Sequence, residues 1–145
     1  MSYNIDFQYK YTTGDTWASG FIATDNNKFE FVCSYLFNNP LEGLLNAVYQ
    51  IVPNLAPFPR KDIDFIMLDE PTEYRWEFKI IDEKNLTISI YEKGYDLKTE
   101  LIFEENCKLY NLLKALTQCI SSNPDLKSNE KIERMYNHFK RYLKK

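Results

Sequence analysis

Apolar and polar side chains alternate without interruption between residues 3 and 11. The odd positions hold Tyr3, Ile5, Phe7, Tyr9 and Tyr11, and the even positions hold Asn4, Asp6, Gln8 and Lys10. A period of two places successive side chains on opposite faces of a β-strand, with one face on a core and the other in water. The chain therefore has to form a sheet that buries one of its faces.

The same alternation recurs further along the chain and predicts two groups of strands. The first group comprises residues 3–11, 17–23 and 28–37, and the second comprises residues 64–68, 74–81, 86–90 and 97–103. Short turn-forming stretches such as 13–15 and 25–27 join the strands within a group. Because the connections within a group are so short, we expect about seven strands in two antiparallel meanders.

Three segments repeat apolar residues at the three-four spacing of an amphipathic helix. They run from Pro40 to before Pro53, from after Asn106 to about 121, and from Ser128 to about Leu143. Asn38 or Asn39 can cap the first helix, and we expect Asn106 to cap the second. Pro53, Pro57 and Pro59 predict a crossing loop between the first helix and the second group of strands.

These elements predict a single α+β domain over residues 1–145, in which about three helices pack on a mainly antiparallel, twisted sheet. A length of 145 residues suits one domain, and an aromatic content of 16% excludes disorder for the body of the chain. Since no apolar run reaches membrane-spanning length and no signal-like segment opens the chain, we expect a soluble, cytoplasmic protein.

Cysteine, histidine and glycine usage argues against several chemistries. Cys33, Cys107 and Cys119 are odd in number and have no metal-ligand spacing, so we expect reduced, buried thiols. We expect Cys107 and Cys119 to share the second helix, about 18 Å apart and beyond disulfide reach. The single histidine, His138, is interpreted as an ordinary helix residue. The four glycines never cluster into a phosphate-binding loop, which excludes a P-loop or Rossmann site, and we expect neither cofactor nor metal.

Charge is unevenly distributed along the chain. Residues 127–145, the expected basic C-terminal helix, carry seven Lys or Arg against two Glu, whereas residues 1–126 have a net charge of −8. Residues 62–83 alone carry eight carboxylates against two cations. The candidate partner-binding residues in this segment are Asp62, Asp64, Asp69, Glu70, Glu73 and Glu77. They predict either a solvated face or a docking surface that attracts a basic partner. The basic helix interleaves its cations with apolar residues, which indicates a solvated helix face; we expect no nucleic-acid or membrane partner.

Two segments resemble a group of small bacterial proteins. They are Phe37-Asn38-Asn39-Pro40-Leu41-Glu42-Gly43-Leu44-Leu45-Asn46-Ala47 and Asp69-Glu70-Pro71-Thr72-Glu73-Tyr74-Arg75-Trp76-Glu77-Phe78. In that group a "DPLxxLLxA" helix start precedes a "DEPxEYRWxF" strand, and some members are similar to the immunity proteins of toxin systems. Asn39 stands where that pattern has Asp, which keeps a capping side chain but removes a charge. The resemblance brings no active-site residues and implies a protein that blocks a toxin by docking.

We therefore expect a non-enzymatic protein-binding domain, similar to an immunity protein, that uses its acidic segment. Two alternatives remain open. One is an enzyme or small-ligand binder with an aromatic-lined pocket around Tyr74, Trp76 and Glu77. The other is a structural subunit that buries apolar sheet surface in a homodimer, which the high Tyr and Phe content would suit.

Overall fold

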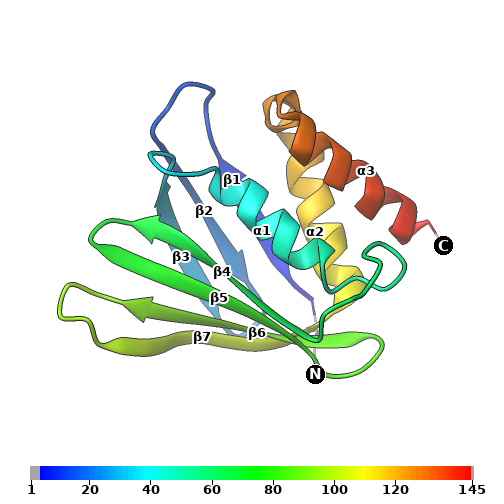
Figure 1. Ribbon diagram of the computed structural model, residues 1–145, viewed down its shortest axis with the longest axis horizontal. Coiled ribbons are helices and arrows are strands. Elements are labelled where there is room, and N and C mark those ends of the chain that lie inside the picture. Colours follow the sequence, from blue (N-terminus) through cyan, green and yellow to red (C-terminus); the bar gives the residue numbers. More distant parts are fainter. Residues whose placement is uncertain (1–3, 145) are drawn as a thin grey trace.

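The computed structural model describes residues 4–144 and contains two antiparallel sheets (Figure 1). The first sheet has the order β1-β2-β3, formed by Asp6–Lys10, Trp17–Ala23 and Lys28–Ser34. The second sheet has the order β4-β5-β6-β7, formed by Asp62–Asp69, Thr72–Ile80, Asn85–Lys93 and Thr99–Lys108. Every strand pairs with its sequence neighbour, so the two expected meanders are confirmed.

Three α-helices complete the α+β fold, which confirms the expected class. Helix α1 (Pro40–Tyr49) connects the sheets, and α2 (Leu109–Ser122) and α3 (Glu130–Leu143) follow the last strand, separated by the short 3-10 helix η1 (Pro124–Ser128). None of the helices within residues 4–144 has both the length and the apolar character needed to cross a membrane.

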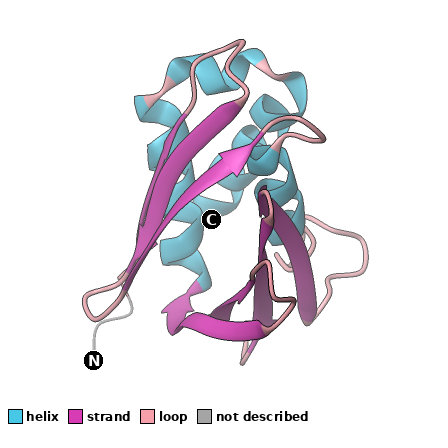
Figure 2. Cartoon of the chain, turned by 90° about the vertical axis from the view of Figure 1, so that its left-hand side faces the viewer, coloured by secondary structure: helices cyan, strands magenta, loops and turns pink. Residues whose placement is uncertain are grey.

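The two meanders form separate sheets rather than one continuous sheet. Figure 2 shows the sheets inclined to each other, with the helices packed over the space between them. Strands β3 and β4 lie close together where the sheets meet, but they belong to different sheets and share no ladder. The core consequently lies between two sheets and three helices.

Aromatic side chains from both sheets fill this core. The strand β1 buries Phe7 and Tyr9 and exposes Gln8 and Lys10, as the alternation predicts. Tyr3, at the start of the predicted strand, lies outside the described residues. In the second sheet Trp76 is fully buried and contacts ring edges of the first sheet, with its centroid 5.7 Å from that of Phe31.

The boundary between β7 and α2 differs from its prediction. Strand β7 extends to Lys108 and α2 begins at Leu109, so Asn106 caps no helix. Instead, the Thr87 hydroxyl donates to Asn106 Oδ1 across the ladder at 2.8 Å. Cys107 therefore lies in a strand, opposite Leu86, and does not share a helix with Cys119. All three cysteines are nevertheless free and buried, as expected.

The ends of the other elements agree with the predictions to within a few residues. The first helix is capped by Asn39, whose Oδ1 accepts from the Glu42 amide at 3.1 Å, as expected. The third helix is capped by Asn129 rather than opened by Ser128, because Asn129 Oδ1 accepts from two backbone amides. Strand β3 ends at Ser34, which places residues 35–37 in the loop before α1.

Candidate functional site

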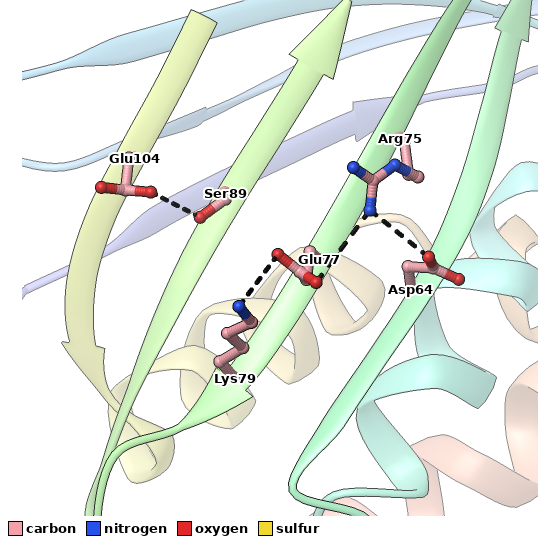
Figure 3. Close-up of polar contacts among 6 residues, drawn as sticks. All are labelled: Asp64, Arg75, Glu77, Lys79, Ser89 and Glu104. Carbon is pink, nitrogen blue, oxygen red and sulfur yellow. Dashed lines mark hydrogen bonds and ion pairs between the residues drawn. The ribbon is translucent and has the colours of Figure 1, made fainter. Parts of the chain in front are cut away.

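The second sheet buries one face, and no helix within residues 4–144 covers the other (Figure 3). Its inner positions, such as Trp76, Phe78, Ile88 and Ile90, belong to the core. Figure 3 views the opposite side, and the helices lie behind the strands. We call this side the outer face and define it by Asp62, Asp64, Ile66, Leu68, Glu73, Arg75, Glu77, Lys79, Thr87, Ser89, Tyr91, Lys93, Thr99, Leu101, Glu104 and Asn106.

Strand register arranges polar side chains of the outer face into a row that crosses all four strands. Asp64 lies opposite Glu77, Glu77 opposite Ser89, and Ser89 opposite Glu104. The Ser89 hydroxyl donates to Glu104 Oε2 at 2.9 Å (Figure 3). We call these four residues the polar row, in which three carboxylates share one line on the sheet.

Two cations lie beside the polar row and partly compensate it (Figure 3). Arg75 Nη1 is 3.5 Å from Asp64 Oδ2 and 4.0 Å from Glu77 Oε2, and Lys79 Nζ is 3.8 Å from Glu77 Oε1. Desolvation raises the pKa of Glu77, and the neighbouring Asp62 raises it further, against the opposing effect of Lys79 and Arg75. Burial is therefore the largest cause of the raised Glu77 pKa, and the charge of Asp62 adds to it.

A second row of the outer face has exposed apolar side chains at its two ends and a stacked arginine and tyrosine between them. It contains Ile66, Arg75, Tyr91 and Leu101, which the register brings side by side. Ile66 and Leu101 keep 45% and 46% of their surface in solvent, and the Arg75 guanidinium lies over the Tyr91 ring at 4.5 Å from its centroid. We call these four residues the apolar row. Exposed apolar side chains therefore lie directly beside the acidic ones, and such side chains can exclude water from an interface with another protein.

The six acidic residues singled out in the sequence do not form one surface. Asp62, Asp64 and Glu77 gather on the outer face, and Glu73 lies on the same face opposite Lys93, two rows away from Glu77. Asp69 is the last residue of β4 and, like Met67, occupies a position on the inner side of the sheet. Its pKa is raised by desolvation and by the charge of Glu70, which lies in the turn.

Sequence reasoning missed the carboxylate that completes the polar row and the exposed apolar partners. Glu104 lies on β7, beyond the end of the predicted strand at 103, so it was not assigned to the sheet. A β-bulge between Ile90 and Tyr91 shifts the register of β7, and no local pattern reveals such a bulge. The alternation within β4 could have placed Ile66 beside Asp64, because both occupy even positions.

The aromatic-lined pocket proposed as an alternative does not assemble. Tyr74 and Trp76 point inward, whereas Glu77 lies on the outer face, and Trp76 has no exposed surface. These three residues therefore cannot line a common cavity.

Other chemistry that a site could use is sparse in the described structure. Among residues 4–144, no three His, Cys, Asp or Glu side chains are grouped so that they could hold a metal ion. Burial raises the pKa of Cys33 and of Cys107 to about 12 and that of Cys119 to about 11, so each thiol stays protonated at neutral pH. Protonated, buried thiols are poor nucleophiles.

Comparison with protein-family models, with curated proteins and with solved structures finds no match for this chain. Function therefore has to be inferred from the geometry of the outer face.

Proposed function

We propose that this protein is a non-enzymatic binding protein that docks a basic protein partner on its outer face and, like an immunity protein, blocks a toxin by covering it. The observation that carries the proposal is the juxtaposition of two rows on an uncovered sheet face. The polar row supplies carboxylates, and the apolar row supplies exposed Ile66 and Leu101 next to them.

The two rows have complementary roles in a contact. Desolvated apolar and aromatic side chains near the centre of an interface supply most of its affinity, and surrounding charges select the partner and accelerate association. Tyr91 with its stacked Arg75 is a residue pair of the kind enriched at interfaces. The crowded carboxylates around Glu77 would gain from a cation that a partner brings, because their mutual repulsion would fall.

Charge on the outer face favours a basic partner over a second copy of this chain. The face carries five carboxylates, Asp62, Asp64, Glu73, Glu77 and Glu104, against Arg75, Lys79 and Lys93. A symmetric dimer through this face would bring similar acidic patches together, and like charges across an interface are unfavourable. The resemblance of residues 37–47 and 69–78 to immunity-like proteins supports the same class of partner.

The experiment reverses the charge of Asp62 and Asp64 to Lys and follows a partner captured from the native host. The association rate should fall and lose much of its salt dependence, because exposed charges steer association over about 8 to 10 Å at ordinary ionic strength. Folding should be nearly unchanged, since Asp64 makes only a part-exposed ion pair with Arg75. A matched control reverses Asp15 and Asp25, exposed turn residues next to strands of the first sheet.

The apolar row provides a second and independent measurement. Leu101→Ala should accelerate dissociation while leaving the salt dependence of association unchanged, because it removes contact area and no charge. If the captured partner associates at the same rate with both charge-reversed proteins, and Leu101→Ala leaves its dissociation unchanged, the outer face is not the docking surface.

A further inference from the structure

Helices α1 and α3 run in the same direction (Figure 1). Side chains of both helices line a groove between them. Their N-terminal ends meet where Lys131 Nζ lies 3.6 Å from Glu42 Oε1, and their C-terminal ends meet where Tyr49 packs against His138 and Phe139. The groove encloses about 570 Å³ and shares no residue with the outer face. Its volume lies within the range of small-molecule sites.

The groove carries one cation that the protein does not compensate. Glu42 is already neutralised, because Oε1 faces Lys131 and Oε2 accepts from Asn129 Nδ2 at 2.9 Å. Arg134 also lines the groove, is exposed, and takes part in none of the ion pairs found among residues 4–144. An anionic group in the groove would therefore find a free guanidinium, which binds carboxylate and phosphate through paired N–H donors.

His138 lines the groove and lies near two arginines of α3. Its pKa is lowered by desolvation first and then by the charges of Arg141 and Arg134. Arg141 Nη2 lies 2.9 Å from His138 Nδ1, so a neutral imidazole accepts that bond. The positive charges of Arg134 and Arg141 thus both lower the pKa of His138, which lies at the end of the groove where Tyr49 packs.

The walls of the groove add apolar surface and amide groups. Gly43 lies on the α1 wall of the groove, and a Cβ at that position would lie 3.4 Å from the Phe65 ring, so the glycine lets α1 pack closely on β4. Met135 and Tyr49 contribute half-buried apolar surface, and Asn46 contributes a side-chain amide. An apolar surface with a few convergent polar groups is typical of small-ligand sites.

We propose that the groove between α1 and α3 binds a small organic anion, with its carboxylate or phosphate group on Arg134 and its flat apolar body against Gly43 and Met135. The proposal is independent of docking on the outer face, because the two sites use different elements. Either a carboxylate or a phosphate could supply the anionic group, and the experiment below shows which of the two binds more tightly.

The test titrates the protein with benzoate, phenyl phosphate, inorganic phosphate and neutral benzyl alcohol. The chain has a single histidine, so the His138 imidazole signals in a proton NMR spectrum report on the groove directly. Benzoate or phenyl phosphate should shift these signals with saturation below about 1 mM and should raise the pKa of His138, because a bound anion offsets the Arg134 charge. The stronger of the two identifies the preferred anionic group.

Arg134→Gln should weaken that binding by about tenfold or more, since it removes the charge-assisted contact. Lys140→Gln makes the same charge change on an exposed position of α3 outside the groove lining and should leave the affinity within about twofold, because distant exposed charges are screened. Asn46→Tyr, which narrows the groove, should also weaken binding.

Three results would overturn the proposal. The first is that neither aromatic anion shifts His138, and the second is that Arg134→Gln binds as tightly as the unmodified protein. The third is that inorganic phosphate or benzyl alcohol binds as tightly as the aromatic anions. The groove would then not recognise an anionic group and an apolar body in the same ligand.

Discussion

Trp76, together with Tyr74, packs the second sheet against the first. It belongs to β5, is fully buried, and contacts Phe29 and Phe31 of β3 with ring planes inclined by 74° and 77°. Its Nε1 has no hydrogen-bond partner among residues 4–144. The contribution of this side chain to stability therefore comes from packing, and edge-to-face contacts between aromatic rings are favourable at these separations.

Trp76→Ala should lower the free energy of unfolding by about 3 to 5 kcal/mol, because it empties a large aromatic site in the centre of the core. Trp76→Phe should cost clearly less, since a ring remains between the sheets and no hydrogen bond is lost. Urea denaturation followed by circular dichroism measures both changes. An alanine variant as stable as the unmodified protein would contradict the packing described for β5.

The three thiols should react slowly in the folded protein. Burial raises the pKa of Cys33 and Cys107 to about 12 and that of Cys119 to about 11, so the reactive thiolate is scarce at pH 8 as well as inaccessible. Ellman's reagent should label all three only after denaturation. One cysteine that reacts rapidly in the native protein would show that its surroundings open in solution.

At the scale of elements, the asparagine caps fix where the helices begin. Asn129→Ala should destabilise the protein by about 1 kcal/mol, because Asn129 Oδ1 accepts from the amides of Lys131 and Ile132 at the start of α3. Ser128→Ala is the matched control, and it should cost less because the Ser128 hydroxyl only donates to the Asp125 carbonyl in an exposed position. Thermal unfolding of both variants provides the comparison, and equal losses would speak against Asn129 as the cap.

The sequence predicts element types well because periodicity is a local property. Alternation in β1 and three-four spacing in α1 follow from which face is buried, and both predictions are confirmed. The prediction of the β7–α2 boundary is wrong because Asn106 is a plausible cap when only its sequence neighbours are considered. In the structure the pairing of β6 with β7, which includes Leu86 opposite Cys107, keeps Asn106 in the strand. Pairing between strands decides such a boundary, and pairing is not visible within a short window.

The candidate site was less predictable than the fold for the same reason. The alternation around Trp76 correctly separates Arg75 and Glu77 from the core. The neighbours that make the outer face a surface, Ser89 and Glu104, come from other strands through the register and the β-bulge. A cluster of acidic residues in sequence does not imply a single cluster in space, because Asp69 falls on the inner side of the sheet whereas Glu73 lies on the outer face.

For the whole molecule, the excess charge has opposite signs in two regions: the outer face carries five carboxylates against three cations, and α3 carries four cations against two glutamates. The outer face carries the crowded carboxylates around Glu77, and α3 carries cations such as Arg134 along the groove. A charged partner or ligand is thereby drawn to one of two regions according to its sign, because like charges on the other region repel it. The two proposed sites can consequently be tested by separate variants without mutual interference.

Both sheets and all three helices contribute to one cluster of buried residues, so we expect the chain to unfold as a single cooperative unit. The two tryptophans test this, because Trp17 belongs to β2 and is 41% exposed, whereas Trp76 is buried in β5. Trp17→Phe leaves a reporter in the second sheet, and Trp76→Phe leaves one in the first. Within each variant, the fluorescence and circular dichroism midpoints in urea should coincide. If the Trp17 signal of Trp76→Phe changes at a lower urea concentration than the circular dichroism of the same variant, the first sheet opens on its own in that variant, and the rest of the shared core does not hold the two sheets as one unit.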